Sequence, residues 1–178
     1  PVQTTAPAIA ASIDQAAWTS QKKSLTIANG LKLSYVELGH PKGEPLLLLH
    51  GYTDSSRSWS LTAPYLKGYR LLIPDQRGHG GSDAPVCCYG TSQLAYDASL
   101  FLDALGVEKA AVVGHSPGSM VAITSAAEHP KRVARIVLIG STALIPVKPG
   151  DWLYESASSL RAPPDPSSPF LREWHAGH

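Results

Sequence analysis

Residues 110–120 read AAVVGHSPGSM: a short apolar run, then the pattern G-x-S-x-G, then residues that suit a helix. In the order strand, sharp turn and helix, this pattern predicts a serine exposed at the tip of the turn. Gly114 and Gly118 flank that serine, because only small residues let the backbone fold back so tightly. Ser116 is therefore a candidate nucleophile. The alternative is an ordinary tight turn that carries a surface serine.

Short, continuous apolar runs recur along the chain, at residues 45–49, 71–74, 110–113 and 136–139. Strands of this kind are buried on both faces, which is typical of parallel sheets covered by helices. The sequence between these runs predicts helices at residues 59–66, 91–105 and 120–128. This alternation predicts an α/β fold with a mostly parallel, doubly wound sheet.

Ahead of these runs, residues 24–27 and 31–36 alternate between apolar and polar side chains. Asn29 and Gly30 lie between them, and this pair suits a type I′ turn. The pattern predicts a hairpin at the N-terminal end of the sheet, with one face exposed.

The composition argues against several classes of partner. The chain has 178 residues and a formal net charge of +1, with no block of Lys and Arg residues, so we expect no nucleic-acid partner. No apolar run approaches the roughly 18 residues of a membrane-spanning helix, so we expect no membrane partner. The histidines are scattered and no phosphate loop or dinucleotide fingerprint is present, so we expect neither a metal nor a cofactor.

The two ends differ in character from the middle. We expect a flexible N-terminal segment over residues 1–20, the main α/β core over 21–143 and the start of a proline-rich cap or lid over 144–178. The Ala-, Pro- and Thr-rich start without Met is typical of a mature protein after signal-peptide removal, which indicates a secreted or periplasmic location. The alternative is a trimmed start, in which case the protein is cytoplasmic.

The two cysteines are neighbours, Cys87 and Cys88. Neighbouring cysteines rarely bond to each other, so we expect two buried small residues. The alternative is that one of them reaches a thiol elsewhere.

A second group of residues follows the run at 46–49. His50, Gly51 and Tyr52 would lie at the carboxyl end of that strand, the edge of a parallel sheet where ligands bind. We expect Gly51 and Tyr52 to contribute to oxyanion and substrate binding, chiefly through the Tyr52 amide, which would donate to a developing oxyanion. The alternative is a plain glycine turn.

Four further residues are expected to support the site without reacting. Asp75 and Arg77 follow the run at 71–74 and are expected to hold neighbouring loops by charged hydrogen bonds. His50 and His115 are the other two supporting residues.

Residues 45–51, 75–82 and 114–118 together resemble, in order and spacing, the α/β-hydrolase superfamily. More narrowly, they resemble its serine esterase, lactonase and perhydrolase branch, in which a helical cap follows the sixth strand. The resemblance spans residues 25–142 and implies an ester-cleaving catalytic triad and an oxyanion hole. Epoxide hydrolases and haloalkane dehalogenases of the superfamily carry aspartate at the position of Ser116. The serine therefore favours acyl transfer.

Pro117 departs from the family pattern. In the family, the residue after the nucleophile gives a backbone N–H to the oxyanion hole, and proline has none. We expect a weaker activity than in the relatives, or an unusual donor such as the Gly118 amide or a side chain of the loop 52–55.

The rest of the catalytic triad is the second departure. The family order is serine, acid, histidine, but His129 lies at the far end of the predicted helix, roughly 18 Å from the serine. His175 and His178 lie in the irregular segment after residue 143. Residues 136–139 would also form a bare apolar sheet edge. We expect that the chain lacks the last strands, and that a missing C-terminal segment or a complementary polypeptide supplies the catalytic Asp and His.

The resulting expectation is a serine hydrolase of small-molecule carboxylic esters or lactones that works through an acyl-enzyme on Ser116. One alternative is a catalytically weakened, hydrolase-like protein that binds a ligand without turnover. Another is a perhydrolase or a carbon–carbon bond hydrolase that uses the same serine.

Overall fold

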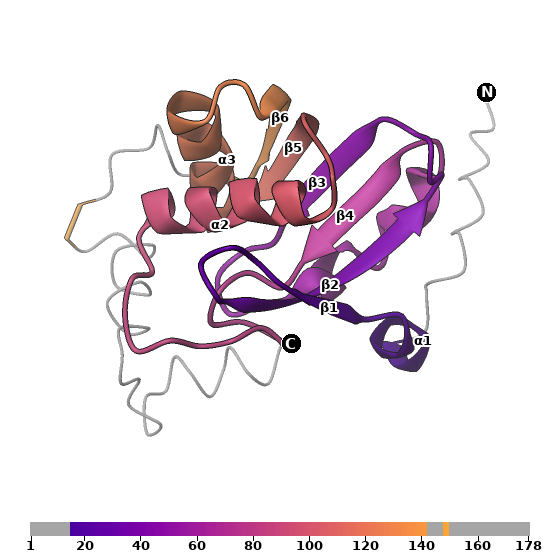
Figure 1. The fold of residues 1–178 in the computed structure, drawn as a ribbon, viewed down its shortest axis with the longest axis horizontal. Helices are drawn as coiled ribbons and strands as arrows, with labels where there is room; N and C mark the ends of the chain where they lie inside the picture. The colour runs from indigo at the N-terminus through magenta and orange to yellow at the C-terminus, as the bar shows by residue number, and fades with distance from the viewer. Residues whose placement is uncertain (1–14, 142–147, 150–178) are drawn as a thin grey trace, which may run out of the picture. The chain divides into compact units, whose positions relative to one another are not determined.

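A mixed sheet of six strands in the order β1-β2-β4-β3-β5-β6 forms the centre of the computed structural model, which describes residues 15–141 and 148–149 (Figure 1). The first two strands are antiparallel to their neighbours, and the remaining strands are parallel to one another. This is the mostly parallel α/β sheet that the apolar runs predict. The strands are β1 (Lys23–Thr26), β2 (Lys32–Gly39), β3 (Pro45–Leu49), β4 (Arg70–Pro74), β5 (Ala110–His115) and β6 (Val133–Ile139).

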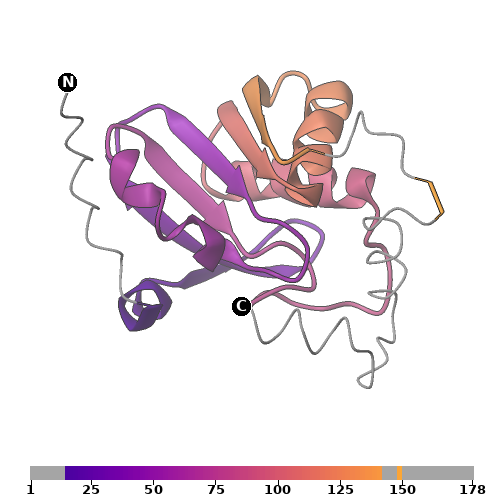
Figure 2. The same ribbon diagram turned by 180° about the vertical axis from the view of Figure 1, so that it is seen from behind.

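Both faces of the central strands are covered. Leu47 and Leu49 of β3 face a core shared with the helices α2 (Thr91–Ala104) and α3 (Pro117–Glu128). Leu46 and Leu48 face the other side, where they pack in a second core with helix α1 (Gln15–Ser20) and with the two 3₁₀ turns that follow β3. Figures 1 and 2 show α2 and α3 side by side on one face of the sheet. The alternation along each strand explains why these runs are apolar throughout.

The hairpin forms, but its turn differs from the expected type I′ turn. Gly30 lies at φ +85°, whereas Asn29 is not in the left-handed region that a type I′ turn requires of both central residues. The Gly30 N–H donates to Ile27 O, and the Ile27 N–H donates to Leu31 O. The connection is therefore a three-residue loop that ends in a left-handed glycine. Asn29 instead uses its side chain, which accepts from the Leu31 N–H.

The helix expected at residues 59–66 is also absent, and two short 3₁₀ turns take its place, η1 (Ser56–Trp59) and η2 (Ala63–Tyr65). Pro64 lies at the start of η2, where it cannot donate to a preceding helical carbonyl. The two turns still bury Trp59 and Ala63 against the sheet. The longer helix α2 ends at Ala104, two residues before Gly106, the glycine expected to stop it, whose φ is +65°.

The cysteines contradict the expectation of two buried, unbonded residues. Cys87 and Cys88 are both exposed, and they are bonded to each other. Their loop, which joins β4 to α2, lies outside both hydrophobic cores and offers no apolar environment for the two side chains.

Strand β6 pairs with β5 and is the edge of the sheet within residues 15–141. Its side chains are largely in contact with solvent: Val137, Leu138 and Ile139 are 48%, 39% and 43% exposed. Residues 15–141 belong to one compact unit. The expected flexible segment over residues 1–20 is described only at residues 15–20, which form α1 and bury Trp18. The expected cap over residues 144–178 is described only at residues 148–149.

Candidate active site

Ser116 sits in a strained turn between β5 and α3. Its φ is +53°, in the left-handed region that residues other than glycine rarely adopt. The Ser116 N–H donates to Ile139 O at 2.8 Å, which ties the turn to the end of β6. Strain of this kind persists only where the surrounding structure enforces it, and it clusters at functional sites.

The two glycines of the G-x-S-x-G pattern are required by close backbone contacts. A Cβ on Gly114 would lie 2.2 Å from Gly118 O, and a Cβ on Gly118 would lie 2.5 Å from Leu49 O. Neither position has room for a side chain, because the opposing atoms belong to the backbone. The turn can therefore bring α3 close against β3 only with glycine at both places.

The turn after β3 reaches the same place. A Cβ on Gly51 would lie 3.3 Å from Ser116 Cβ and 3.2 Å from His115 Nδ1. The structure thus brings together Ser116, Gly51 and His115, three of the residues that the sequence singles out. Tyr52 follows Gly51 directly, and its side chain is 52% exposed.

His50 fixes the turn after β3 by a hydrogen bond to Gly51 O. It is fully buried, and its Nε2 accepts from the Gln76 N–H at 2.9 Å. Because a backbone N–H can only donate, the ring proton must lie on Nδ1, which donates to Gly51 O at 2.7 Å. Burial lowers the pKa of His50 to about 4, so the ring is neutral at pH 7.

The bond from His50 to Gly51 O also fixes the direction of the next amide. In a planar trans peptide, the carbonyl and the following N–H point in opposite directions. With the Gly51 carbonyl held toward His50, the Tyr52 N–H must point away from the imidazole. The site therefore contains a backbone donor with a fixed orientation, in the turn that touches Ser116.

Gln76 completes this arrangement, and the sequence reading does not single it out. Its side-chain Nε2 donates to His50 O at 2.7 Å. Gln76 thus bonds the same residue through both its backbone and its side chain. The signal that could have identified it is its position two residues after the end of β4, the strand next to β3.

Asp75 joins three separate segments. Its carboxylate accepts from the Ser56 N–H at 2.8 Å, from the Gly81 N–H at 2.9 Å and from Lys22 Nζ at 2.6 Å. Burial raises the pKa of the carboxyl, but these hydrogen bonds outweigh burial and leave the pKa of Asp75 below its ordinary value. The charged form therefore holds η1, the loop after β4 and the segment after α1.

Arg77 pairs with Asp97 of α2, a residue that the sequence reading does not select. Two bonds connect them, Nε to Oδ2 at 2.6 Å and Nη2 to Oδ1 at 3.0 Å, and both side chains are almost fully buried. The bond to Asp97 raises the pKa of Arg77 above its ordinary value. Asp97 also accepts from Asn29 and Gln93, so it connects the hairpin to α2 and to the loop after β4.

Pro117 occupies the first position of α3. Its ring suits the first turn of a helix, where a backbone N–H has no helical partner. For the same reason, the position directly after Ser116 offers no donor to an oxyanion. The Ser116 carbonyl accepts from the backbone and the side chain of Ser119, which closes the first turn of the helix.

Within residues 15–141, no histidine is hydrogen-bonded to Ser116 Oγ. His129 caps the far end of α3, and the ring of His79 packs against that of His50, at a centroid distance of 5.0 Å. His175 and His178 lie outside the described residues.

The described residues contain no group of three or more His, Cys, Asp or Glu side chains placed to hold a metal ion. No helix among them is long and apolar enough to cross a membrane.

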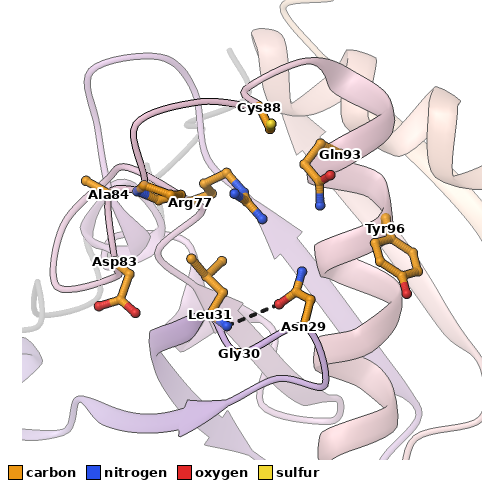
Figure 3. Close-up of a pocket in the computed structure, with 10 residues that line it drawn as sticks. Asn29, Gly30, Leu31, Arg77, Asp83, Ala84, Cys88, Gln93 and Tyr96 are labelled. Atoms are coloured by element: carbon orange, nitrogen blue, oxygen red, sulfur yellow. Dashed lines mark hydrogen bonds between the residues drawn. The ribbon is translucent and has the colours of Figure 1, made fainter.

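A groove of about 640 Å³ lies between the hairpin turn, the loop after β4 and α2 (Figure 3). Its lining includes Asn29, Arg77, Cys88, Gln93 and Tyr96. Neither Ser116 nor Tyr52 lines it, so the groove is separate from the candidate nucleophile.

Comparisons with known proteins agree with this geometry. The sequence model of the alpha/beta hydrolase fold matches residues 44–163. Epoxide hydrolase A of Mycobacterium tuberculosis is 37% identical over 124 residues, which are 67% of this chain and 38% of that protein. Lipase 1 of Psychrobacter immobilis is 34% identical over 151 residues, which are 84% of this chain and 45% of that protein.

A solved hydrolase structure is also similar to this chain. A hydrolase from Pseudomonas aeruginosa PA01 is 30% identical, with a TM-score of 0.71, over 88% of this chain and 57% of that structure. The chain spans less than half the length of the two curated relatives that it matches here.

Proposed function

Because this chain belongs to the α/β-hydrolase fold family, we propose that it supplies the nucleophile of a serine hydrolase that cleaves small carboxylic esters or lactones. The observation that carries the proposal is the backbone of Ser116, held at φ +53° between two glycines that have no room for a side chain. Such a turn presents a hydroxyl at the sheet edge where substrates of α/β folds bind.

In the proposed reaction, Ser116 Oγ attacks the ester carbonyl carbon and a histidine takes its proton. The carbonyl oxygen becomes an oxyanion, which accepts a hydrogen bond from the Tyr52 N–H. Collapse of this intermediate expels the alcohol, which takes the proton from the histidine, and leaves an acyl-enzyme. Water then repeats the sequence and releases the acid.

The histidine and its acid partner are proposed to lie outside residues 15–141. The support is that no described histidine bonds to Ser116 Oγ, while the family order places both groups after the serine. We propose that they belong to a further part of the protein, on this polypeptide or on a complementary one. The exposed edge of β6, whose Ile139 carbonyl already binds the Ser116 N–H, is the side of the sheet on which that part would pack.

The choice of ester over epoxide rests on the nucleophile. One similar relative is an epoxide hydrolase and another is a lipase. The resemblance described above places aspartate at this turn in the epoxide hydrolases, whereas this chain has Ser116. A serine alkoxide gives an acyl-enzyme with an ester, so the lipase-like chemistry is the better fit. A perhydrolase or a carbon–carbon bond hydrolase would use the same serine.

A second candidate is a hydrolase-like protein that binds its ligand without turnover. Pro117 favours it, because this residue removes one of the two backbone donors of the usual oxyanion hole. The two candidates differ in one observable, the reactivity of Ser116.

The test is a reaction of the full-length protein with a fluorophosphonate probe, followed by intact-mass analysis and tryptic mapping. The peptide of residues 110–131 holds Ser116. We expect one probe adduct on this peptide, none in Ser116→Ala, and an unchanged adduct in the matched control Ser125→Ala. The intact masses also reveal a complementary polypeptide where one exists.

Turnover then separates the chemistries. Hydrolysis of p-nitrophenyl esters of short acids is expected, with loss of activity in Ser116→Ala. Hydrolysis of a small epoxide without ester hydrolysis would contradict the proposal. Tight binding of an ester with no adduct and no turnover would favour the binding protein.

A further inference from the structure

The loop between β4 and α2 carries the bonded pair Cys87 and Cys88 at its tip. Both side chains are exposed to solvent, and so is Val86 beside them. These are the only cysteines in the sequence, so no other thiol of this chain can exchange with them. Exposed disulfides are the ones that react most readily with external thiols.

Tyr89 fastens the base of this loop independently of the disulfide. Its hydroxyl donates to Pro85 O at 2.5 Å. Its ring lies so close to Gly78 that a Cβ there would be 2.5 Å from Tyr89 Cε1. The residues on both sides of the cysteine pair are thus tied together whether the pair is bonded or not.

Cys88 has an unusual backbone. Its φ is +73°, and within residues 15–141 only two other residues besides glycine have a positive φ, Thr53 and Ser116. The Cα atoms of the pair are 3.8 Å apart, as adjacent residues must be, which is below the roughly 4.4–6.8 Å of most disulfides. Without the bond, nothing in the covalent structure would hold Cys88 in the left-handed region.

We propose that Cys87–Cys88 is a reversible thiol–disulfide exchange site whose reactant is an external dithiol, and that its oxidation state sets the conformation of residues 86–88. A thiolate of the dithiol attacks one exposed Sγ, forms a mixed disulfide and releases the other cysteine as a thiolate. The second thiol of the reactant then displaces the bound cysteine. Two electrons and two protons pass to the protein, and the dithiol leaves as a disulfide.

The reverse reaction is favoured by sequence adjacency. After reduction the two thiols remain on neighbouring residues, so their encounter is intramolecular and the bond can form again without any rearrangement of the fold. A pair of cysteines brought together by tertiary structure lacks this property once the chain unfolds.

A change in the conformation of this loop would also change the shape of the groove, because Cys88 is one of the residues that line it. Cys88 lines one wall of it, together with Gln93 and Tyr96 of α2 (Figure 3). The opposite wall is the hairpin turn, where Asn29 is held by its bond to Asp97 at 2.8 Å. Reduction should therefore alter the wall at Cys88 and leave the hairpin wall in place.

The test uses the full-length protein, purified under air and kept folded. One sample is treated with dithiothreitol, both are alkylated with iodoacetamide, and the tryptic peptide of residues 78–109, which holds both cysteines, is weighed. We expect no alkylation before reduction and two alkyl groups after it. Replacement of dithiothreitol by oxidised glutathione, without alkylation, should restore the disulfide, seen as the loss of two hydrogens from the peptide while the glutathione disulfide is reduced.

NMR three-bond couplings measure the backbone of the loop. Reduction should move the φ of Cys88 out of the left-handed region and should leave the resonances of residues 27–31 unchanged. In the double variant Cys87→Ser/Cys88→Ser, the φ of residue 88 should match that of the reduced protein, and dithiothreitol should not change it. The fluorophosphonate adduct on Ser116 is a separate readout, and it is expected to be equal in both oxidation states.

Three results would overturn the proposal: alkylation before any reductant is added, reduction only after denaturation, or a failure of the disulfide to form again. An unchanged φ of Cys88 in the two states would overturn its conformational part. A missing adduct on Ser116 would bear on the proposed hydrolase function and not on the exchange site.

Discussion

His50 and Gln76 bind each other at two points: the Gln76 N–H donates to His50 Nε2 at 2.9 Å, and Gln76 Nε2 donates to His50 O at 2.7 Å. His50 in turn holds Gly51 O, so the pair fixes the peptide that ends in the Tyr52 N–H. The proposed oxyanion donor is thus positioned by two residues that need not touch substrate.

The side chain of Gln76 should therefore matter for the rate and not for substrate binding. In Gln76→Ala we expect kcat to fall about tenfold, a loss of about 1.4 kcal/mol in the transition state, with KM nearly unchanged. The reason is that an oxyanion forms only in the transition state. Gln93→Ala, which removes a glutamine from the groove, is the matched control and should retain full kcat. A rise in KM at constant kcat would refute the positioning role.

The buried His50 makes stability depend on pH in a defined window. Its pKa falls from 6.5 to about 4 on folding, so the unfolded chain binds the proton more readily. The stability from a neutral His50 is fully present above pH 6.5 and declines as the pH falls toward 4, by up to about 3 kcal/mol. Urea unfolding of the wild type and of His50→Gln at pH 7, 5.5 and 4.5 measures it. We expect the free energy of unfolding of the variant to fall less over this range. Equal slopes would show that His50 is not the group responsible.

Gly118 should tolerate no side chain. In Gly118→Ala the added Cβ would meet Leu49 O at 2.5 Å, and neither backbone can move aside without disturbing the contact of α3 with β3. We expect a loss of about 2 kcal/mol or more in the free energy of unfolding, together with loss of the Ser116 adduct. Gly68→Ala is the control, because a Cβ there would meet nothing within 4 Å. Thermal unfolding of both variants separates a local clash from a general intolerance of alanine.

The buried pair of Arg77 and Asp97 should be far more sensitive to truncation than an exposed pair. Arg77→Ala leaves the Asp97 carboxylate buried with only its bonds to Asn29 and Gln93, at a cost of about 3–5 kcal/mol. Arg135→Ala removes the exposed bond to Glu44 and should leave the free energy of unfolding within experimental error. Denaturant unfolding of both variants gives the comparison. Similar effects of the two substitutions would contradict a special role for the buried pair.

The parallel strands and the turn at Ser116 could be predicted from the sequence because each depends on neighbouring residues. An apolar run of four or five residues identifies a strand of the parallel sheet. The runs of β3, β4 and β5 are buried, whereas the run of β6 is exposed at the edge of the described sheet. The glycines at 114 and 118 report on backbone crowding that the turn creates within a few residues. The apolar runs and the two glycines are both local features of the sequence, and the structure forms the strands and the turn that they predict.

The remaining parts of the site could not be predicted, since they depend on contacts between distant segments. Asp97 lies 20 residues after Arg77, and Gln76 lies 26 residues after His50. No periodicity marks such pairs before the order of the strands is known. The hairpin turn differs from the expected type I′ turn for a related reason. The side chain of Asn29 bonds Asp97 and the Leu31 N–H, and the residue keeps a negative φ.

Pro117 offers the sharpest test of the proposed chemistry. Pro117→Met would restore a backbone N–H directly after Ser116, at the first position of α3, where the amide has no helical partner. One oxyanion donor contributes up to about 10²–10³ in kcat, so an increase of at least about tenfold is expected when the new amide points at the oxyanion. Loss of the rigid proline should lower the free energy of unfolding by about 0.4–1 kcal/mol. Pro130→Met, beyond the other end of the helix, is the control and should leave kcat unchanged. An unchanged kcat in Pro117→Met, with the Ser116 adduct still forming, would mean that another group already supplies the second donor.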